Sequence, residues 1–252
     1  MTVTIQQADW QKVLAEVVGT FFFFFIGIGS VAWVQTGGVV YVALAHGLAL
    51  AIAISALGHI SGAHFNPAVT LGLMVARKIS PVLAILYIMG QIVGGILACL
   101  AVAFVLPPGT VQNATPHLAG GIGMLEAIIL EAILTFFLVI AVFGTAVDPR
   151  ATRIGGFGIG LTVFVDILVG GPVTGGVMNP ARAIAPAIIA RDFQPDMLVY
   201  WVGPIVGGII AALLYSMIFL PKGDEPVIKA PDATDKLVEP PLSEPGLVTD
   251  RS

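Results

Sequence analysis

The tripeptide Asn-Pro-Ala occurs twice in this chain, within GHISGAHFNPAVT at residues 58–70 and within GGVMNPARA at residues 175–183. Asparagine is a preferred residue just before the first turn of a helix. Proline suits the first helical position, because its fixed φ is already helical and its missing N–H is not needed there. The two tripeptides, Asn66-Pro67-Ala68 and Asn179-Pro180-Ala181, therefore each predict the capped start of a helix.

Each predicted helix continues as a short apolar stretch, near residues 67–77 and 180–190. Both stretches are roughly half of the about 20 residues that a helix needs to cross a bilayer. A glycine-rich loop precedes each of them, at residues 58–62 and 170–176. This pattern predicts two half-helices that enter the membrane and do not cross it.

The composition of the whole chain is that of a membrane protein. Of its 252 residues, 57% are hydrophobic and 10% are charged, and the mean hydropathy is +0.99. An ordinary soluble domain has roughly a quarter of its residues charged. Six apolar runs have the length of a span, near residues 13–34, 39–58, 82–106, 123–147, 154–171 and 197–220. The sequence thus predicts an all-α membrane protein with six transmembrane helices and two re-entrant half-helices.

The charged residues predict the orientation and the limits of the membrane domain. If the spans alternate, the basic residues of the short loops all lie on one side of the membrane: Lys12, Arg77, Lys78, Arg150 and Arg153. We expect this side, and both termini, to face the cytoplasm. We expect a cytoplasmic N-terminus over residues 1–12 and a membrane domain over 13–220. Residues 221–252 are rich in charge and proline, which predicts a disordered cytoplasmic tail. Most of the net charge of −4 lies there, so it indicates no nucleic-acid partner.

The two halves of the membrane domain resemble each other. The second Asn-Pro-Ala follows the first by 113 residues, and QIVGGI at residues 91–96 matches PIVGGI at residues 204–209 with the same offset. Each repeat, about residues 13–106 and 123–220, contains three spans. Because three is an odd number, the second repeat must enter the membrane from the opposite face. The sequence therefore predicts an inverted repeat whose half-helices meet head to head near the bilayer midplane.

The meeting point of two such half-helices has a defined chemistry. Each helix start carries about half a positive elementary charge, and the side-chain amides of Asn66 and Asn179 can donate to a passing solute. A positive midplane lined by donors repels cations. A water molecule that gives its oxygen to both amides turns its hydrogens outward, which prevents a proton from hopping along a file of water. The expected partners are water and small neutral solutes.

The chain resembles the aquaporin (major intrinsic protein) family over about residues 10–220. The likeness is carried by the two Asn-Pro-Ala segments, by AEVVGT at residues 15–20 and by YWVGP at residues 200–204. The resemblance implies a passive channel in a lipid bilayer. It also implies a homotetramer in which every protomer has its own pore.

The resemblance further implies a selectivity filter near the outer mouth, and the register gives His46, Ile167, Gly176 and Arg182 for its four positions. An arginine at membrane depth is costly unless it faces water or a partner. Arg182 is therefore expected to offer donors to a solute and to repel cations, with a packing salt bridge as the alternative. His46 is expected to face the pore as donor and acceptor, the alternative being an interhelical histidine with satisfied hydrogen bonds.

The residue types in this filter predict the solute. In the strict water channels of the family these four positions hold Phe, His, Cys or Thr, and Arg, whereas in glycerol facilitators they hold Trp, Gly, Phe and Arg. The set in this chain is similar to that of the ammonia-permeable tonoplast-type aquaporins of plants. Compared with strict water channels, Ile167 replaces a histidine that donates a hydrogen bond, and Gly176 replaces a residue with a side chain. We therefore expect a wider and less polar constriction that admits ammonia as well as water. Ala183 and Tyr200-Trp201 match the water channels of the family.

Other polar residues receive roles from the same resemblance. Glu16 and Glu131, at matching positions of the repeats, are expected to accept hydrogen bonds from the re-entrant loops, with a proton relay as the alternative. His117 resembles a loop histidine that reaches the filter in the plant channels, the alternative being a surface histidine. His64 is expected to narrow the cytoplasmic half of the pore. Asp166, an acid beside Ile167, departs from the pattern, and the sequence leaves its role open.

Three function classes follow from these observations. The first is a passive channel for water and ammonia, and a glycerol or small-polyol facilitator is the alternative within the channel class. A coupled secondary transporter is a remote alternative, since inverted repeats with broken helices also occur there. No nucleophile–base pairing or metal-ligand cluster indicates an enzyme, so we expect no cofactor and no metal, and Cys99 alone excludes an intrachain disulfide. The expected location is the cell (plasma) membrane.

Overall fold

The computed structural model describes residues 7–152 and 154–221, and the regular secondary structure of this part of the chain is entirely helical, with no strand. The longer helices are α1 (Gln7–Ser30), α2 (Val34–Ser61), α4 (Pro81–Val105), α6 (Met124–Val142), α7 (Phe157–Gly170) and α9 (Val199–Leu214). The short ones are α3 (Pro67–Val75), α5 (Thr110–Ala114) and α8 (Pro180–Ala190). Short 3-10 turns cover Val31–Trp33 and Pro195–Leu198, and π-helical turns cover Phe143–Val147 and Tyr215–Phe219. The predicted all-α architecture is confirmed. Arg153 and most of the predicted tail lie outside the described residues.

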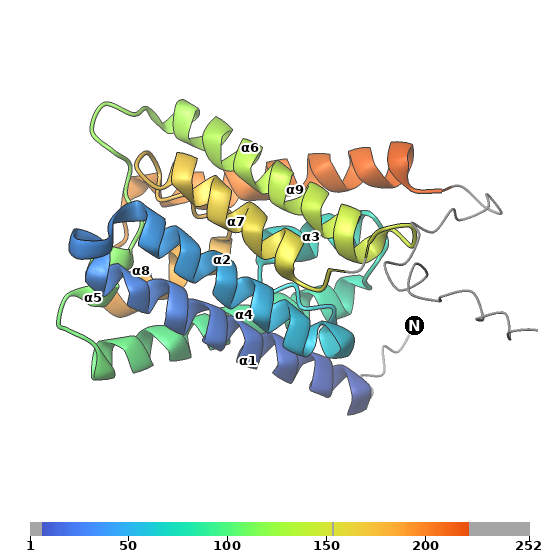
Figure 1. Ribbon diagram of the computed structural model, residues 1–252, viewed down its shortest axis with the longest axis horizontal. Coiled ribbons are helices and arrows are strands. Elements are labelled where there is room, and N and C mark those ends of the chain that lie inside the picture. Colours follow the sequence, from blue (N-terminus) through green and yellow to red (C-terminus); the bar gives the residue numbers. More distant parts are fainter. Residues whose placement is uncertain (1–6, 153, 222–252) are drawn as a thin grey trace, which may run out of the picture.

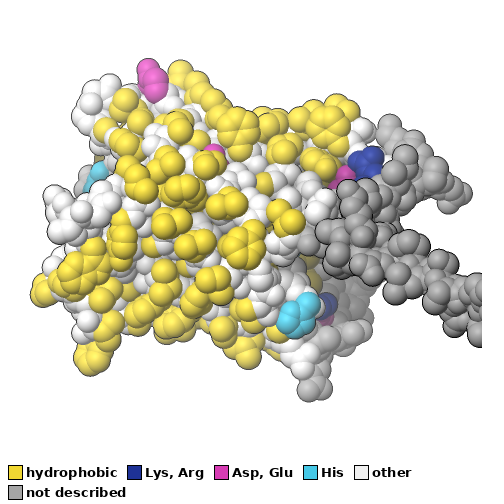
Figure 2. Space-filling model, viewed as in Figure 1, with side chains coloured by type: hydrophobic (Ala, Val, Ile, Leu, Met, Phe, Trp, Pro, Cys, Tyr) yellow, Lys and Arg dark blue, Asp and Glu magenta, His cyan; other side chains and the backbone are white. Residues whose placement is uncertain are grey.

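The long helices run side by side in one bundle (Figure 1). The first turn of α1 and the last turn of α9 lie at the same end, which we call the terminal end, and α5 lies at the opposite end, the α5 end. Figure 2 shows mainly hydrophobic side chains along the side of the bundle and most charged ones near its two ends. This distribution is the one that a surrounding bilayer requires.

Four segments are long and apolar enough to cross a membrane: Asp9–Ser61, Pro81–Val105, Met124–Val147 and Pro195–Phe219. The first of them holds two spans, because α1 and α2 pack against each other. Gly38, with φ 67°, interrupts the helical backbone near the start of α2. The run expected at residues 154–171 is a helix of only 14 residues, α7, or about 21 Å. It begins late because Gly155 has a left-handed backbone, with φ 60°.

The packing of the helices follows the repeat. Helix α1 packs along α4, and α6 packs along α9 in the same way. Each half-helix packs mainly on a helix of the other repeat, α3 on α9 and α8 on α4. Gly94 and Gly207, 113 residues apart, permit the two long pairings: a Cβ at either position would collide with a carbonyl oxygen, of Val17 or of Ala132.

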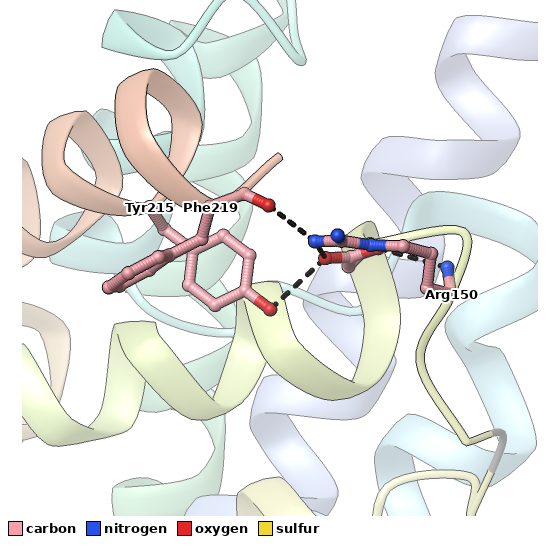
Figure 3. A network of polar contacts seen from close by, with 4 residues as sticks. Arg150, Tyr215 and Phe219 are labelled. Atoms are coloured by element: carbon pink, nitrogen blue, oxygen red, sulfur yellow. Dashed lines mark hydrogen bonds and ion pairs between the residues drawn. The ribbon is translucent and has the colours of Figure 1, made fainter. Parts of the chain in front are cut away.

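A cluster of polar groups joins the end of α6 to the end of α9 at the terminal end (Figure 3). The Asp148 side chain, 4% exposed, accepts from Arg150 Nη2 at 2.7 Å and Nε at 3.0 Å, and from the Tyr215 hydroxyl at 3.2 Å. Arg150 Nη2 also donates to the carbonyl oxygen of Phe219, in the last turn of the described helix. The hydrogen bonds from Arg150 lower the pKa of Asp148 to about 2.

Replacing Asp148 by alanine is expected to lower the free energy of unfolding at pH 7 by about 1–3 kcal/mol, because charged hydrogen bonds at a buried carboxylate are lost. A carboxylate whose pKa is lowered by folding stabilises the protein above its unfolded pKa, near 4, and loses this contribution as the pH falls toward about 2. Thermal unfolding of the purified protein at several pH values measures the difference, which should shrink below pH 4. Tyr215→Phe, which deletes only the 3.2 Å bond, is the control and should cost less. A pH-independent difference would contradict this account.

Candidate functional site

Both Asn-Pro-Ala segments form capped helix starts in the interior of the bundle. The Oδ1 atom of Asn66 accepts from Ala68 N at 2.8 Å, at the start of α3. The Oδ1 atom of Asn179 accepts from Ala181 N at 3.0 Å, at the start of α8. Both asparagines have extended backbones and are at least 96% buried, with exposed fractions of 4% and 3%. The structure therefore brings the starts of the two half-helices to a common point.

The two asparagines also fasten the two loops to each other. Asn66 Nδ2 donates to the carbonyl of Met178 at 2.8 Å, and Asn179 Nδ2 donates to the carbonyl of Phe65 at 2.9 Å. Each carbonyl belongs to the residue just before the other asparagine, and both of those residues have left-handed backbones, with φ 49° at Phe65 and 54° at Met178. Each amide thus donates one N–H to the opposite loop, and its second N–H has no partner among the described residues. Sequence reasoning assigned the amides to the solute alone and missed this link.

Glu16 and Glu131 each accept hydrogen bonds from the backbone of one re-entrant loop. The Glu16 carboxylate accepts from the backbone N–H groups of His64 at 2.9 Å and Phe65 at 2.8 Å. The Glu131 carboxylate accepts from those of Val177 at 2.9 Å and Met178 at 2.6 Å. Further donors are Ser61 Oγ at 2.7 Å and Gln91 Nε2 at 2.8 Å for Glu16, and Thr174 Oγ1 at 2.6 Å for Glu131. These contacts match the loop-supporting role that the family resemblance implies.

Two tyrosines complete this support, and sequence reasoning did not find them in that role. Tyr87 donates its hydroxyl to the carbonyl of Ser61 at 2.7 Å, and Tyr200 donates to the carbonyl of Thr174 at 2.9 Å. Both tyrosine side chains are buried. The signal was available in the sequence, because 113 residues separate the two tyrosines and also the two hydroxyl residues that they contact.

A cavity of about 520 Å³ is lined by residues from both ends of the bundle. At the α5 end its wall includes Val31, Val39 and His117, and at the terminal end it includes Ile54 and Ala146. Most of the wall is apolar. Polar side chains enter it at a few levels, from His46, His64, Asn66, Asn113, Thr115, His117, Asn179 and Arg182. The two asparagines and the four filter residues, His46, Ile167, Gly176 and Arg182, therefore share one cavity. Four other residues predicted for the pore are not part of its wall: Pro67, Ala68, Pro180 and Ala181.

His46 and Arg182 hold each other at the α5 side of the asparagines. His46 Nδ1 lies 2.9 Å from the carbonyl of Val42, which can only accept, so the ring proton is on Nδ1. His46 Nε2 then accepts from Arg182 Nε at 3.3 Å, and Arg182 Nη1 donates to the carbonyl of Ala114 at 2.9 Å. Among the described residues, Nη2 of Arg182 has no hydrogen-bond partner in the protein. Arg182 makes no salt bridge in this part of the chain, so the guanidinium keeps donor capacity and its full charge toward the cavity.

The other two filter positions present no hydrogen-bonding side chain. Gly176 has φ 57°, and a Cβ there would lie 3.2 Å from the Gly171 nitrogen and the Ile167 Cα, so a side chain would be strained and crowded. Ile167 is buried with 5% exposure and lines the cavity from α7. The backbone itself therefore favours the absence of a side chain at residue 176.

The remaining candidates lie in different surroundings. His64 lines the cavity, and its Nδ1 lies 3.1 Å from Thr70 Oγ1. His117 lines the outer part of the cavity, with Nε2 at 3.1 Å from Asp192 Oδ2. Asp166 is 5% exposed and absent from the cavity wall, and its Oδ2 has no hydrogen-bond partner among the described residues. Within residues 7–152 and 154–221, no group of three or more His, Cys, Asp or Glu could hold a metal.

A helical membrane bundle with two half-helices that start from a common interior point, along one cavity, defines a membrane channel. The model of the major intrinsic protein family matches residues 3–215, and the chain belongs to this family. The family that the sequence motifs predicted is therefore confirmed.

The relatives include plant aquaporins. Aquaporin TIP4-4 of Zea mays is 43% identical over 229 residues, which cover 84% of this chain and 88% of the relative. Probable aquaporin TIP3-2 of Arabidopsis thaliana is 42% identical over 230 residues, with 84% and 85% covered. Among solved structures, the aquaglyceroporin of Plasmodium falciparum has a TM-score of 0.74 at 24% identity and covers 83% of this chain and 96% of its own. That structure supports the fold alone.

Proposed function

We propose that the protein is a passive water channel through which ammonia also passes. The observation that carries the proposal is one cavity whose lining residues come from both ends of the bundle and include both asparagines and Arg182. The names of the plant relatives, which are aquaporins, support the same function. The family is one of channels, and we propose no enzymatic activity for this chain.

The polar groups along the cavity account for selection. Arg182 and the free N–H of each asparagine are donors, so a neutral solute with a lone pair is bound and passed on, whereas a cation meets a positive charge and two positive helix ends. On two sides the constriction is lined by the apolar side chain of Ile167 and by Gly176, which has no side chain. Ammonia is less strongly hydrated than an ion and fits such a site.

The direct test uses the purified chain in proteoliposomes. Stopped-flow light scattering measures osmotic water permeability, and a pH-sensitive dye inside the vesicles reports ammonia entry. Water permeability at the level of empty liposomes would refute the proposal. Glycerol uptake faster than ammonia uptake would favour the polyol facilitator, and a flux that depends on a proton or sodium gradient would favour the secondary transporter.

Replacing His46 by phenylalanine is expected to lower the ratio of ammonia permeability to water permeability by roughly fivefold. This factor corresponds to the loss of one hydrogen bond of about 1 kcal/mol. The change removes the acceptor of Arg182 Nε and installs the residue type of strict water channels. The two permeabilities are measured in the same vesicles. Ile167→Val, which alters the filter without changing its polarity, should leave the ratio near its original value. An unchanged ratio in His46→Phe would show that His46 does not select.

The protein is an integral multi-pass membrane protein, and we propose that its terminal end faces the cytoplasm. The basic residues Lys12, Arg77, Lys78 and Arg150 belong to segments at this end, as the positive-inside rule requires. Because Cys99 is buried, labelling of an introduced Lys78→Cys from one side of sealed cells tests the orientation. The relatives, named as TIP aquaporins, do not support the expected plasma-membrane location. We further propose a homotetramer, which native mass spectrometry tests.

A further inference from the structure

The loop between α5 and α6 holds a histidine whose ring contacts an acid instead of the filter arginine. His117 lines the same cavity as Arg182, but its Nε2 lies 3.1 Å from the carboxylate of Asp192, in the segment that joins α8 to α9. Arg182 donates instead to His46 and to the carbonyl of Ala114, the last residue of α5. In this chain, therefore, the end of α5 rather than the loop histidine holds the arginine.

The backbone on both sides of His117 is fastened. On one side, Thr115 N donates to the last turn of α5 at 3.1 Å, and Pro116 has a fixed φ. On the other side, Leu118 N lies 3.4 Å from Asp196 Oδ2, and Ala119 N donates at 2.9 Å to a carbonyl of the loop before α8. With the backbone held, the position of the imidazole depends on rotation about its own side-chain bonds.

Asp192 is held in place to receive this ring. Its backbone N–H donates to the carbonyl of Ala187 at 3.0 Å, just after Arg191, whose φ is 56°. Its second carboxylate oxygen, Oδ1, accepts from Gln194 Nε2 at 2.6 Å. The remaining oxygen, Oδ2, is the one that contacts His117. The acid thus offers a preformed acceptor on the outer wall of the cavity.

We infer that Asp192 is a positioning residue of the outer mouth. Its carboxylate holds the His117 ring against the wall of the cavity and keeps the part of the cavity next to Arg182 open. The inference rests on the proposed function of a water channel. Without this acceptor, the ring turns toward the cavity, where Gly175 and Gly176 present no side chain to oppose it. The two partners are 46% and 30% exposed, and a contact between such exposed groups changes populations by at most roughly fivefold. The contact therefore sets how often the mouth is narrowed.

A double-mutant cycle in proteoliposomes tests this. Asp192→Ala is expected to lower water permeability per protein by about twofold or more, because the ring then spends most of its time over the filter. In the His117→Ala background the same change at residue 192 should have no effect, which a merely structural role of Asp192 would not produce. Asp192→Asn keeps a hydrogen-bond acceptor and should lie between the wild type and Asp192→Ala. Glu126→Gln, which neutralises an exposed acid in the first turn of α6, is the charge-matched control and should not reduce permeability.

Two outcomes overturn the inference: an equal loss in both backgrounds, or no loss while His117 is present. A second readout is independent of transport. The ring Cε1–H resonance of His117, assigned by its absence in His117→Ala, should shift in Asp192→Ala and remain in place in Glu126→Gln. An unmoved resonance in Asp192→Ala refutes the contact even if the wild type passes no water, whereas a shifted one with no water flow shows that the proposed function alone has failed.

Discussion

Replacing Glu131 by alanine is expected to abolish both the folded channel and its water permeability. The buried carboxylate of Glu131 accepts from Thr174 Oγ1 and from the backbone N–H groups of Val177 and Met178. Three donors left without a partner inside the membrane cost about 1–3 kcal/mol each. Their sum is comparable with the total stability of a folded domain, about 5–15 kcal/mol.

The measurement is the yield of monodisperse protein in size-exclusion chromatography, followed by stopped-flow permeability of whatever is recovered. Glu126→Ala is the matched control, because Glu126 lies in the first turn of the same helix and its side chain is exposed. It should behave as the wild type. Glu131→Ala protein that runs as a single species and passes water at the normal rate would disprove the supporting role.

Replacing Arg182 by alanine is expected to let cations and protons through a channel that still passes water. Arg182 is the only Lys or Arg among the described residues that line the cavity. A unit charge at about 4 Å contributes about 4 kcal/mol at an effective dielectric constant of 20, or roughly a thousandfold in the rate of cation passage. Removing the side chain also widens the constriction beside Gly176.

Proton flux is measured with a pH-sensitive dye in vesicles under a fixed potential, and water flow is measured in the same preparation. Arg182→Lys is the control, because it keeps the positive charge while it loses the planar group that reaches both His46 and Ala114. It should remain far less leaky than Arg182→Ala. An Arg182→Ala channel that conducts water and stays as impermeable to protons as the wild type would show that the barrier lies elsewhere.

Most of the fold could be predicted from the sequence, because its strongest signals are local. The capped starts at Pro67 and Pro180 and the long apolar runs each depend on a few neighbouring residues. The π-helical turns at Phe143–Val147 and Tyr215–Phe219 and the five-residue helix α5 were not predicted. Their formation depends on contacts between segments far apart in the chain, such as that of Asp148 with Tyr215.

The candidate site was predictable as a set of residues and less so as a set of contacts. The repeat offset and the family register place His46, Ile167, Gly176 and Arg182 on one cavity wall. Neither could indicate that His46 directs Nδ1 to its own helix and Nε2 to Arg182, since this depends on the approach of α2 to α8. The pairing of His117 with Asp192 was out of reach for the same reason: 75 residues separate them, and no repeat signal links them. The functional assignments of these residues remain predictions.

The link between the two asparagines also has a consequence for how the chain is made. The Nδ2 atom of Asn66 finds its acceptor on Met178, 112 residues later in the sequence. While only the first repeat has emerged from the ribosome, that amide and the Phe65 carbonyl both lack their partners. The first re-entrant loop therefore reaches its final form only after the second has entered the membrane, which makes closure of the centre a late step of biogenesis.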